Sequence, residues 1–259
     1  MLDAFHISAS SLQAHQVHVD VIANNLANAN TTGFKKSKVQ FKDLMYAELV
    51  SANNRLANPD VDSGRGLGAA AAAIEKVFSQ GEIKSTDRNL DIAIQGKGFF
   101  ELLLPDGEYA YSRTGHLQVD RDGMLVNTDG YALNPSIYIP ADAQAVLIST
   151  NGDISVQVPD QAKPVEIGRI DLAGFMNPGG LSPMGDNLYR SSHESGDAFY
   201  GEPGDEGFGT LAQGFLEGSN VSLIEELTDL MLAQRGYELN AKVIQAADDM
   251  MGIVNNLRR

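Results

Sequence analysis

The sequence contains few side chains whose type and spacing could perform chemistry. It has no cysteine, which excludes disulfides, thiolate catalysis and cysteine-ligated metal sites. His15 and His18 are three residues apart and could share one face of a helix, but no third ligand accompanies them. Asp120 and Asp122 resemble the start of a calcium loop, yet Gly123 comes too early and no glutamate closes the pattern. We interpret the histidines as interface or solvated residues and the aspartates as turn residues.

Two glycine-rich stretches could in principle hold a phosphate. Gly96 and Gly98 flank Lys97, but a phosphate cradle needs a helix behind it, and the residues after Gly98 predict a strand. The glycines at 64–68 lack the preceding strand that a dinucleotide fingerprint requires. No nucleophile elbow of the Gly-x-Ser-x-Gly type is present, and no carboxylate pair stands out by its spacing. The sequence therefore predicts no catalytic, cofactor or metal site, and a protein that is not an enzyme.

Composition narrows the partners that this chain could have. The net charge is −15, which argues against binding to nucleic acid or to an anionic membrane. No run of about 18 apolar residues could span a bilayer. The N-terminus lacks the basic region and apolar core of a secretory signal peptide, so we expect any export to use another route.

The two ends of the chain predict long amphipathic helices. Residues 3–29 would span about 40 Å and residues 222–256 about 50 Å at the usual helical rise. Apolar positions recur every seven residues in the first segment and alternate by four and three in the second, as in a coiled-coil seam. The first stripe consists of Phe5, Leu12, Val19 and Leu26, with Ile22 in a second line. The second stripe consists of Leu223, Leu227, Leu230, Gln234, Tyr237, Ala241, Ile244, Asp248 and Met251.

We expect these stripes to become buried when copies of the chain meet, because each is too narrow to bury a helix on all sides. The alternative is a core pair of helices inside an ordinary globular domain. Gln234 and Asp248 would weaken a seam but could fix its register and partner number. A helix end needs fewer asparagines than the three at Asn24, Asn25 and Asn28, and Asn is a poor helix former. These residues therefore predict polar contacts between helices.

The middle of the chain predicts antiparallel β-structure. Asp-Gly and Asn-Gly turns at 106–107, 122–123, 129–130 and 151–152 supply the positive backbone angles that hairpins need. Short apolar runs between such turns predict a sandwich or barrel, with strands at 99–104, 117–119, 137–139, 146–148, 154–158 and 165–172.

The fold class that follows is α+β, with coiled-coil-like terminal helices around a central antiparallel β-rich domain. The expected segments are a first helix at 1–33, an extended arm at 34–85, a β-rich outer domain at 86–205, a return segment at 206–221 and a second helix at 222–259. A lysine cluster in the arm, at residues 35–42, either meets an acidic face of another subunit or is solvated.

Separate short motifs are spread along nearly the whole chain. They are Asn24–Asn28 followed by Thr32-Gly33-Phe34, residues 91–100, Tyr111–Gly115, Gly123–Val126, Glu217–Val221 and Gln234–Glu238. In this order they resemble the N-terminal, central and C-terminal signatures of the bacterial flagellar rod and hook axial proteins, most closely those of the distal rod type.

The resemblance implies a structural subunit that stacks helically into a hollow shaft across the periplasm, in the basal body of the flagellum. The helices would form an inner tube, with the β-rich domain outside. The shaft would join the proximal rod proteins to the hook protein, turn inside the P-ring and L-ring proteins, and be exported by the flagellar type III apparatus without a cleaved signal peptide. No cofactor, nucleic acid or membrane insertion is implied.

The residues that we expect at the interface between subunits belong to the stripes and to the N-terminal signature. They are Phe5, Leu12, Val19, Ile22, Asn24, Asn25, Leu26, Asn28, Phe34, Leu223, Leu227, Leu230, Gln234, Tyr237, Ile244 and Met251. One alternative is another member of the same family, a proximal rod or hook subunit. A more remote alternative is an enzyme or a ligand-binding module on a β-scaffold.

Overall fold

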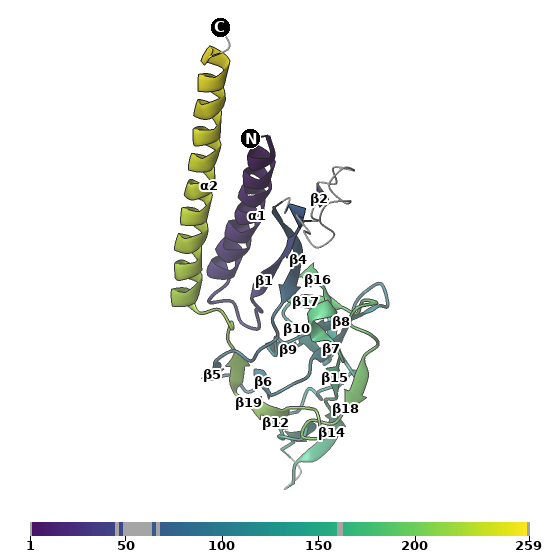
Figure 1. The fold of residues 1–259 in the computed structure, drawn as a ribbon. Helices are drawn as coiled ribbons and strands as arrows, with labels where there is room; N and C mark the ends of the chain where they lie inside the picture. Colours follow the sequence, from purple (N-terminus) through teal and green to yellow (C-terminus); the bar gives the residue numbers. More distant parts are fainter. Residues whose placement is uncertain (1, 45–46, 49–63, 66–67, 160–162, 258–259) are drawn as a thin grey trace. The chain divides into compact units, whose positions relative to one another are not determined.

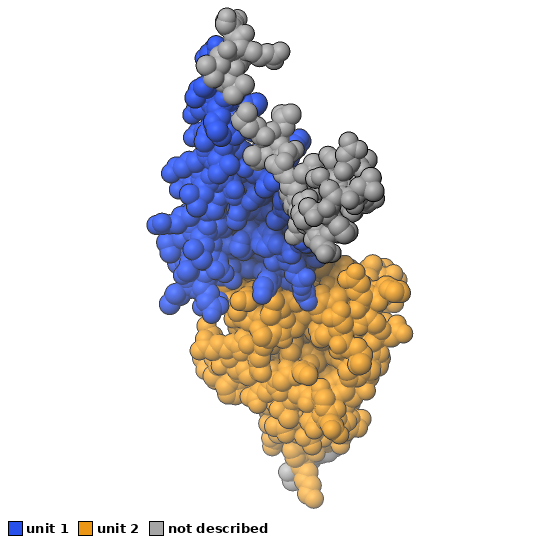
Figure 2. Space-filling view, in the orientation of Figure 1, with its two compact units in different colours: residues 1–27, 37–75, 222–259 blue, residues 28–36, 76–221 orange. Residues whose placement is uncertain are grey.

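The computed structural model describes residues 2–44, 47–48, 64–65, 68–159 and 163–257 (Figure 1). Its described part is α+β, with an α-helix at each end and β-strands between them. The chain forms two compact units, which Figure 2 shows in different colours. Unit 1 comprises residues 1–27, 37–75 and 222–259, and unit 2 comprises residues 28–36 and 76–221. The predicted arm at 34–85 is described only in part, because residues 45–46, 49–63 and 66–67 lie outside the described residues.

The elements of unit 1 are the two helices and four strands. They are α1 (Leu2–Ala27), β1 (Ser37–Asp43), β2 (Ala47–Glu48), β3 (Gly64–Arg65), β4 (Ala69–Lys76), whose last residue belongs to unit 2, and α2 (Leu223–Leu257).

Unit 2 contains sixteen strands and a short 3-10 helix in its described part. They are β5 (Ile83–Ser85), β6 (Ile92–Gln95), β7 (Phe100–Leu103), β8 (Tyr109–Ser112), β9 (Leu117–Val119), β10 (Leu125–Asn127), β11 (Ala132–Asn134), β12 (Ala145–Ile148), β13 (Asp153–Gln157), β14 (Val165–Arg169), β15 (Leu172–Gly174), η1 (Pro178–Gly180), β16 (Ser182–Gly185), β17 (Leu188–Arg190), β18 (Phe199–Gly201), β19 (Thr210–Gln213) and β20 (Phe215–Glu217).

Small and polar side chains join α1 to α2. Asn25 Nδ2 donates to Glu226 Oε2 over 3.1 Å, and Asn240 Nδ2 donates to Ser11 Oγ over 2.9 Å. Because the later residue of α1 contacts the earlier residue of α2, the two helices are antiparallel (Figure 1). Ala233, midway between the two contacts, is buried on the same side of α2. The helices of one chain therefore cover part of each other.

The expected packing of the terminal helices as a coiled-coil-like inner tube is wrong. The structure has two helices that pair within one chain, and the side chains that hydrogen-bond across this pair are not residues of the predicted seam. A Cβ atom added at Gly236 would lie 2.8 Å from His15 Cε1, so the imidazole of His15 packs directly against the backbone of α2. Five predicted seam residues of α2 stay exposed: Leu223, Leu227, Gln234, Tyr237 and Asp248.

Within unit 1, β1 pairs with β4 and β2 pairs with β3. Asn25 joins β1 to α1, because its side chain accepts from Ser37 N and donates to Ser37 O, both over 2.9 Å. Val39 is buried, and the rings of His18 and Phe41 meet edge-on with 5.5 Å between their centroids.

An antiparallel sheet of seven strands dominates unit 2, in the order β16-β17-β8-β7-β11-β10-β9. A three-stranded sheet, β12-β13-β14, and three strand pairs, β6 with β19, β5 with β20 and β15 with β18, surround its apolar core. The last strands before α2 therefore pair with strands near the start of the unit. A second, aromatic cluster contains Phe99, Tyr111, Phe175 and Tyr189.

The four turns predicted from Asp-Gly and Asn-Gly are confirmed. They join β7 to β8, β9 to β10, β10 to β11 and β12 to β13, which are all antiparallel pairs. The glycine of each turn has a positive φ between 83° and 91°. The strand expected at 137–139 is wrong, because this segment forms only an isolated bridge between Tyr138 and Met124.

Candidate subunit interface

Large apolar side chains are exposed along the whole described length of α2. They are Leu223, Ile224, Leu227, Met231, Leu232, Tyr237, Leu239, Val243, Met250 and Ile253. Scattered apolar residues on a surface are ordinary, but so many large ones on a single helix indicate a site of interaction. The contact with α1 thus leaves most of the apolar surface of α2 uncovered.

The predicted stripe on α1 is only partly covered. Phe5, Leu12, Val19 and Leu26 are all partly exposed. Ile22, from the second line, is 2% exposed and belongs to the interior of unit 1.

The predicted stripe on α2 divides into two groups. Leu230, Ile244 and Met251 are partly buried, and Leu223, Leu227, Gln234 and Tyr237 are exposed. The exposed fractions of Leu227 and Tyr237 are both 47%, so each offers about half of its surface to a partner.

The predicted polar residues of the N-terminal signature mostly have roles within the chain. Asn25 is 2% exposed and holds Ser37 and Glu226, as described above. Asn28 accepts a hydrogen bond from Thr31 Oγ1 over 3.2 Å, and Asn24 is exposed on α1. Phe34 is buried, with Lys76 Nζ 4.6 Å from the centroid of its ring. Asn24 is therefore the residue of this group most accessible to a partner.

The two stripes lie on the same side of the helix pair. Leu12 follows Ser11, which contacts α2, and Leu227 follows Glu226, which contacts α1. Each residue of an α-helix is rotated by about 100° from the residue before it, and both helices are right-handed. Because the helices run in opposite directions, the residue after a contact residue points to the same side of the pair in both of them. We call Phe5, Leu12, Val19, Leu26, Leu223, Leu227, Leu230 and Tyr237 the helix-pair face.

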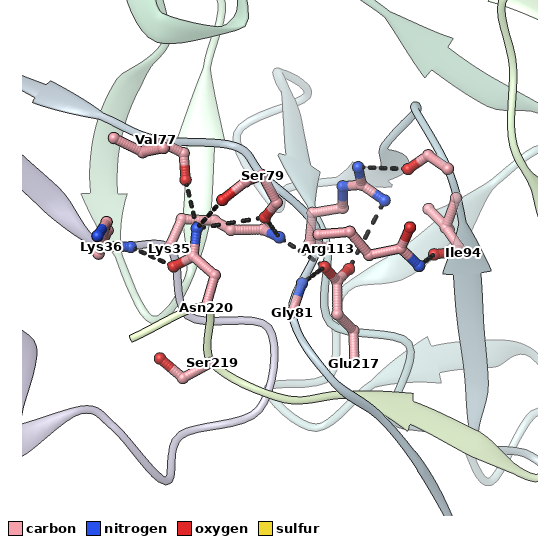
Figure 3. Close-up of polar contacts among 12 residues, drawn as sticks. Lys35, Lys36, Val77, Ser79, Gly81, Ile94, Arg113, Glu217, Ser219 and Asn220 are labelled. Carbon is pink, nitrogen blue, oxygen red and sulfur yellow. Dashed lines mark hydrogen bonds and ion pairs between the residues drawn. The ribbon is translucent and has the colours of Figure 1, made fainter. Parts of the chain in front are cut away.

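A buried ionic cluster in unit 2 was missed from the sequence. Lys35 Nζ lies 2.6 Å from Glu217 Oε1, and Arg113 Nη1 lies 3.6 Å from Glu217 Oε2 (Figure 3). The three side chains are 0 to 3% exposed. Backbone groups complete the cluster, since Gly81 N donates to Glu217 Oε1 over 2.8 Å and Lys35 Nζ donates to Ser79 O over 2.7 Å.

Asn220 makes a second set of contacts beside this cluster (Figure 3). It accepts from Lys36 N over 2.7 Å and donates to Val77 O over 2.7 Å and to Ser79 Oγ over 3.0 Å. Lys35 and Lys36 directly follow the N-terminal motif, whose Gly33 N donates to Glu217 O over 2.8 Å, and Glu217 and Asn220 belong to the C-terminal motif. The two motifs therefore lie close together in space, and each is next to one of the two helices in the sequence.

Burial shifts the pKa values of both cations of the cluster. It lowers the pKa of Lys35 and of Arg113 below their ordinary values, and the carboxylate of Glu217 opposes both shifts. Removing one member of such a cluster leaves an uncompensated buried charge, so the arrangement locks the two motif segments together. Its role is structural, because its charges pair with one another and with backbone groups of the neighbouring segments.

Other kinds of site are not found in the described part of the chain. No group of three or more His, Asp or Glu side chains there could hold a metal ion. None of its helices combines the length and the hydropathy needed to cross a membrane.

Exposed apolar side chains on the helices and buried ion pairs beside the motifs of the β-rich unit are typical of a structural protein that assembles. Comparisons with known proteins agree. Three family models match: "Flagella basal body rod protein" at residues 5–35, "Flagellar hook protein FlgE/F/G D1 domain" at 93–156, and "Flagellar basal body rod FlgEFG protein C-terminal" at 212–257.

Full-length relatives are similar over the entire chain. Flagellar basal-body rod protein FlgG of Borreliella burgdorferi is 43% identical, with all of both chains covered. The FlgG proteins of Caulobacter vibrioides, at 41% identity with 99% of this chain and 100% of the relative covered, and of Bacillus subtilis, at 40% with both chains fully covered, are similar in the same way. The chain belongs to the FlgG family of flagellar basal-body rod proteins. It is a structural subunit of the distal rod, part of a polymeric assembly in the flagellar basal body, and not an enzyme.

Proposed function

We propose that copies of this chain associate through the helix-pair face, and that this contact builds the rod as a hollow shaft which transmits torque. The uncovered apolar surface of α2 is the observation that supports it most. Burying apolar surface is worth about 25 cal/mol per Å², so side chains such as Leu227 and Tyr237 stabilise a polymer when a neighbour covers them.

We also propose the position of this rod within the flagellum, from the family to which the chain belongs. The rod of these subunits would cross the periplasm between the proximal rod proteins and the hook protein, inside the P-ring and L-ring proteins. Subunits would reach it through the flagellar type III export apparatus.

Substitution of half-exposed residues tests the assembly contact. We expect Leu227→Asp combined with Tyr237→Asp to abolish polymerisation of the purified full-length chain, because carboxylates would be buried without partners. Both side chains are about half exposed, so the fold should survive, as circular dichroism would show. Gln245→Asp, at an exposed position of α2 outside the face, is the matched control and should polymerise normally. Polymers of unchanged length from the double variant, seen by electron microscopy, would refute the proposal.

A further inference from the structure

A histidine in unit 2 lies between a buried carboxylate and a guanidinium. His116 Nδ1 lies 2.8 Å from Asp91 Oδ1, and His116 Nε2 lies 3.0 Å from Arg88 Nη1. The side chain of Asp91 is 2% exposed, that of His116 is 26% exposed and that of Arg88 is 53% exposed. The imidazole therefore joins the interior of the unit to its surface.

The partners of the two ring nitrogens determine where the proton of the ring lies. A guanidinium has only N–H donors, so His116 Nε2 must accept the hydrogen bond from Arg88. A neutral imidazole with an accepting Nε2 carries its one proton on Nδ1, and this N–H donates to the carboxylate of Asp91. The contacts thus select a neutral ring in its Nδ1-protonated tautomer.

Backbone contacts hold two of the three residues in place. His116 and Asp91 form an isolated antiparallel bridge, and Gly214 N donates to Asp91 O over 2.8 Å. Arg88 instead lies in the segment between β5 and β6, and about half of its side chain is in contact with water. Of the three side chains, that of Arg88 is the one most able to leave.

Protonation of the ring would oppose one of its two contacts and keep the other. Nε2 would gain a hydrogen and face Arg88 with donor against donor and positive charge against positive charge. Nδ1–H would still donate to Asp91, and the contact would become an ion pair. The half-exposed guanidinium can turn into water, whereas the buried carboxylate cannot.

The charges around the ring come from one segment of the chain. Within the described residues, Arg88 and Asp91 are the charged side chains within ion-pair or hydrogen-bond distance of the imidazole. Asp87 is exposed beside Arg88, and β9 contains no charged residue. From β19, the uncharged Gln213 donates to Asn89 O over 2.7 Å. The charge of the ring itself therefore decides whether it attracts or repels the guanidinium.

We propose that His116 is a pH-sensitive switch, which holds Arg88 against unit 2 when the ring is neutral and releases the guanidinium into solvent when the ring is protonated. Histidine ordinarily changes its charge between about pH 5 and pH 8, so the switch operates within this range. The proposal concerns unit 2 alone and does not depend on the proposed function.

The tautomer of the ring is the first measurement. In the full-length chain labelled with ¹⁵N-histidine, nuclear magnetic resonance at about pH 8 should show His116 with a protonated Nδ1 and an unprotonated Nε2. A ring that carries its proton on Nε2 at this pH could not accept from Arg88, and the proposal would be overturned.

The mobility of the guanidinium is the second measurement. Relaxation of the Arg88 Nε–Cζ group should show an ordered side chain at about pH 8 and a mobile one at about pH 5. Arg121, which is exposed in the turn between β9 and β10, is the internal reference and should be mobile at both pH values. An Arg88 side chain with the same mobility at both pH values would overturn the proposal.

Substitutions of His116 separate the switch from other effects of pH. Glutamine offers an N–H donor to Asp91 and a carbonyl acceptor to Arg88 but does not titrate, so His116→Gln should keep Arg88 ordered at both pH values. His116→Met removes the strong acceptor and should leave Arg88 mobile at both. His193→Gln, at an exposed histidine of the same unit, is the matched control and should retain the response of the unmodified chain. Release of Arg88 by acid in His116→Gln would overturn the proposal, and circular dichroism at both pH values checks that each variant is folded.

Discussion

The imidazole of His15 covers the backbone of Gly236, and a Cβ atom at this glycine would lie 2.8 Å from His15 Cε1 and 3.0 Å from Nε2. We therefore expect Gly236→Ala to displace the His15 ring, which is the end of a side chain and can turn without moving the backbone of α1. The displacement offsets part of the gain of up to about 1 kcal/mol from the better helix propensity of alanine. Chemical unfolding followed by far-UV circular dichroism should show a smaller rise in stability for this variant than for a glycine replaced at an open position of the same helix.

Gly252 gives a matched control on the same helix. No atom lies within 4 Å of a Cβ added there. The propensity effect then acts alone, and Gly252→Ala should raise the free energy of unfolding by about 0.5–1 kcal/mol. An equal rise in the two variants would show that the close contact at His15 does not limit the packing of the pair.

The same glycine explains why the helix contact was not predictable from apolar spacing. The apolar spacing predicts the leucines of α2 as the contact line, since large apolar residues usually fill helix interfaces. Here Ala233 is buried, Gly236 makes room for the His15 ring, and Asn240 supplies a hydrogen bond. The resulting interface is made of residues that an apolar periodicity search ignores.

The β-hairpins could be predicted because their turns depend on adjacent residues. The ionic cluster could not, because its residues are far apart in the sequence. An Asp-Gly or Asn-Gly turn requires only its own backbone angles, so four strand connections followed from the sequence. Lys35 and Glu217 are separated by 182 positions. Lys35 was grouped with a solvated or intersubunit lysine cluster, although it is fully buried. The available signal was a lysine directly after the N-terminal motif and a glutamate at the start of the C-terminal motif, but nothing local pairs them.

Removing Lys35 tests the ionic cluster. Lys35→Met should destabilise the chain by about 3–5 kcal/mol, because Glu217 would keep a buried charge with one fewer cation. Combining it with Glu217→Gln should cost less than the sum of the single changes, since both carry one interaction. Urea unfolding of the four proteins measures this coupling.

Lys84 is the matched control for the cluster. It lies 3.7 Å from Glu82, and both side chains are largely exposed. Lys84→Met should change the free energy of unfolding by no more than about 0.5 kcal/mol, since exposed pairs contribute little. Additive effects of Lys35→Met and Glu217→Gln would show that the buried pair is not coupled.

His18 should make stability depend on pH. Burial lowers its pKa below 6.5; nearby Asp229 and Glu226 oppose the shift, and His15 adds to it. The unfolded chain therefore binds more protons than the folded chain near and below pH 6.5, and stability rises with pH. The contribution of neutral His18 is complete above about pH 7 and is lost as the pH falls through the lowered pKa. His18→Gln should flatten this dependence in urea titrations between about pH 5 and pH 7, and an unchanged slope would assign the dependence to other groups.

A hydrogen bond to a buried carboxylate links Tyr200 to the seven-stranded sheet. Tyr200 Oη donates to Glu101 Oε1 over 2.6 Å, and Glu101 is 2% exposed. Tyr200 is 55% exposed, so water can replace part of this bond, and Tyr200→Phe should cost about 0.5–1.5 kcal/mol. Tyr138, which is similarly exposed at 59%, provides the control, and Tyr138→Phe should be close to neutral.

The same tyrosine should also lower stability in alkali. Burial raises the pKa of Tyr200 above its ordinary value of 10, and the bond to Glu101 raises it further. The folded chain then holds a proton that the unfolded chain releases, so this contribution is present below pH 10 and declines as the pH rises above it. Unfolding free energies measured from about pH 8 to pH 11 should decline less steeply in Tyr200→Phe than in the unmodified chain. Parallel curves would mean that the phenol ionises equally in both states, and that the short contact with Glu101 does not hold its proton.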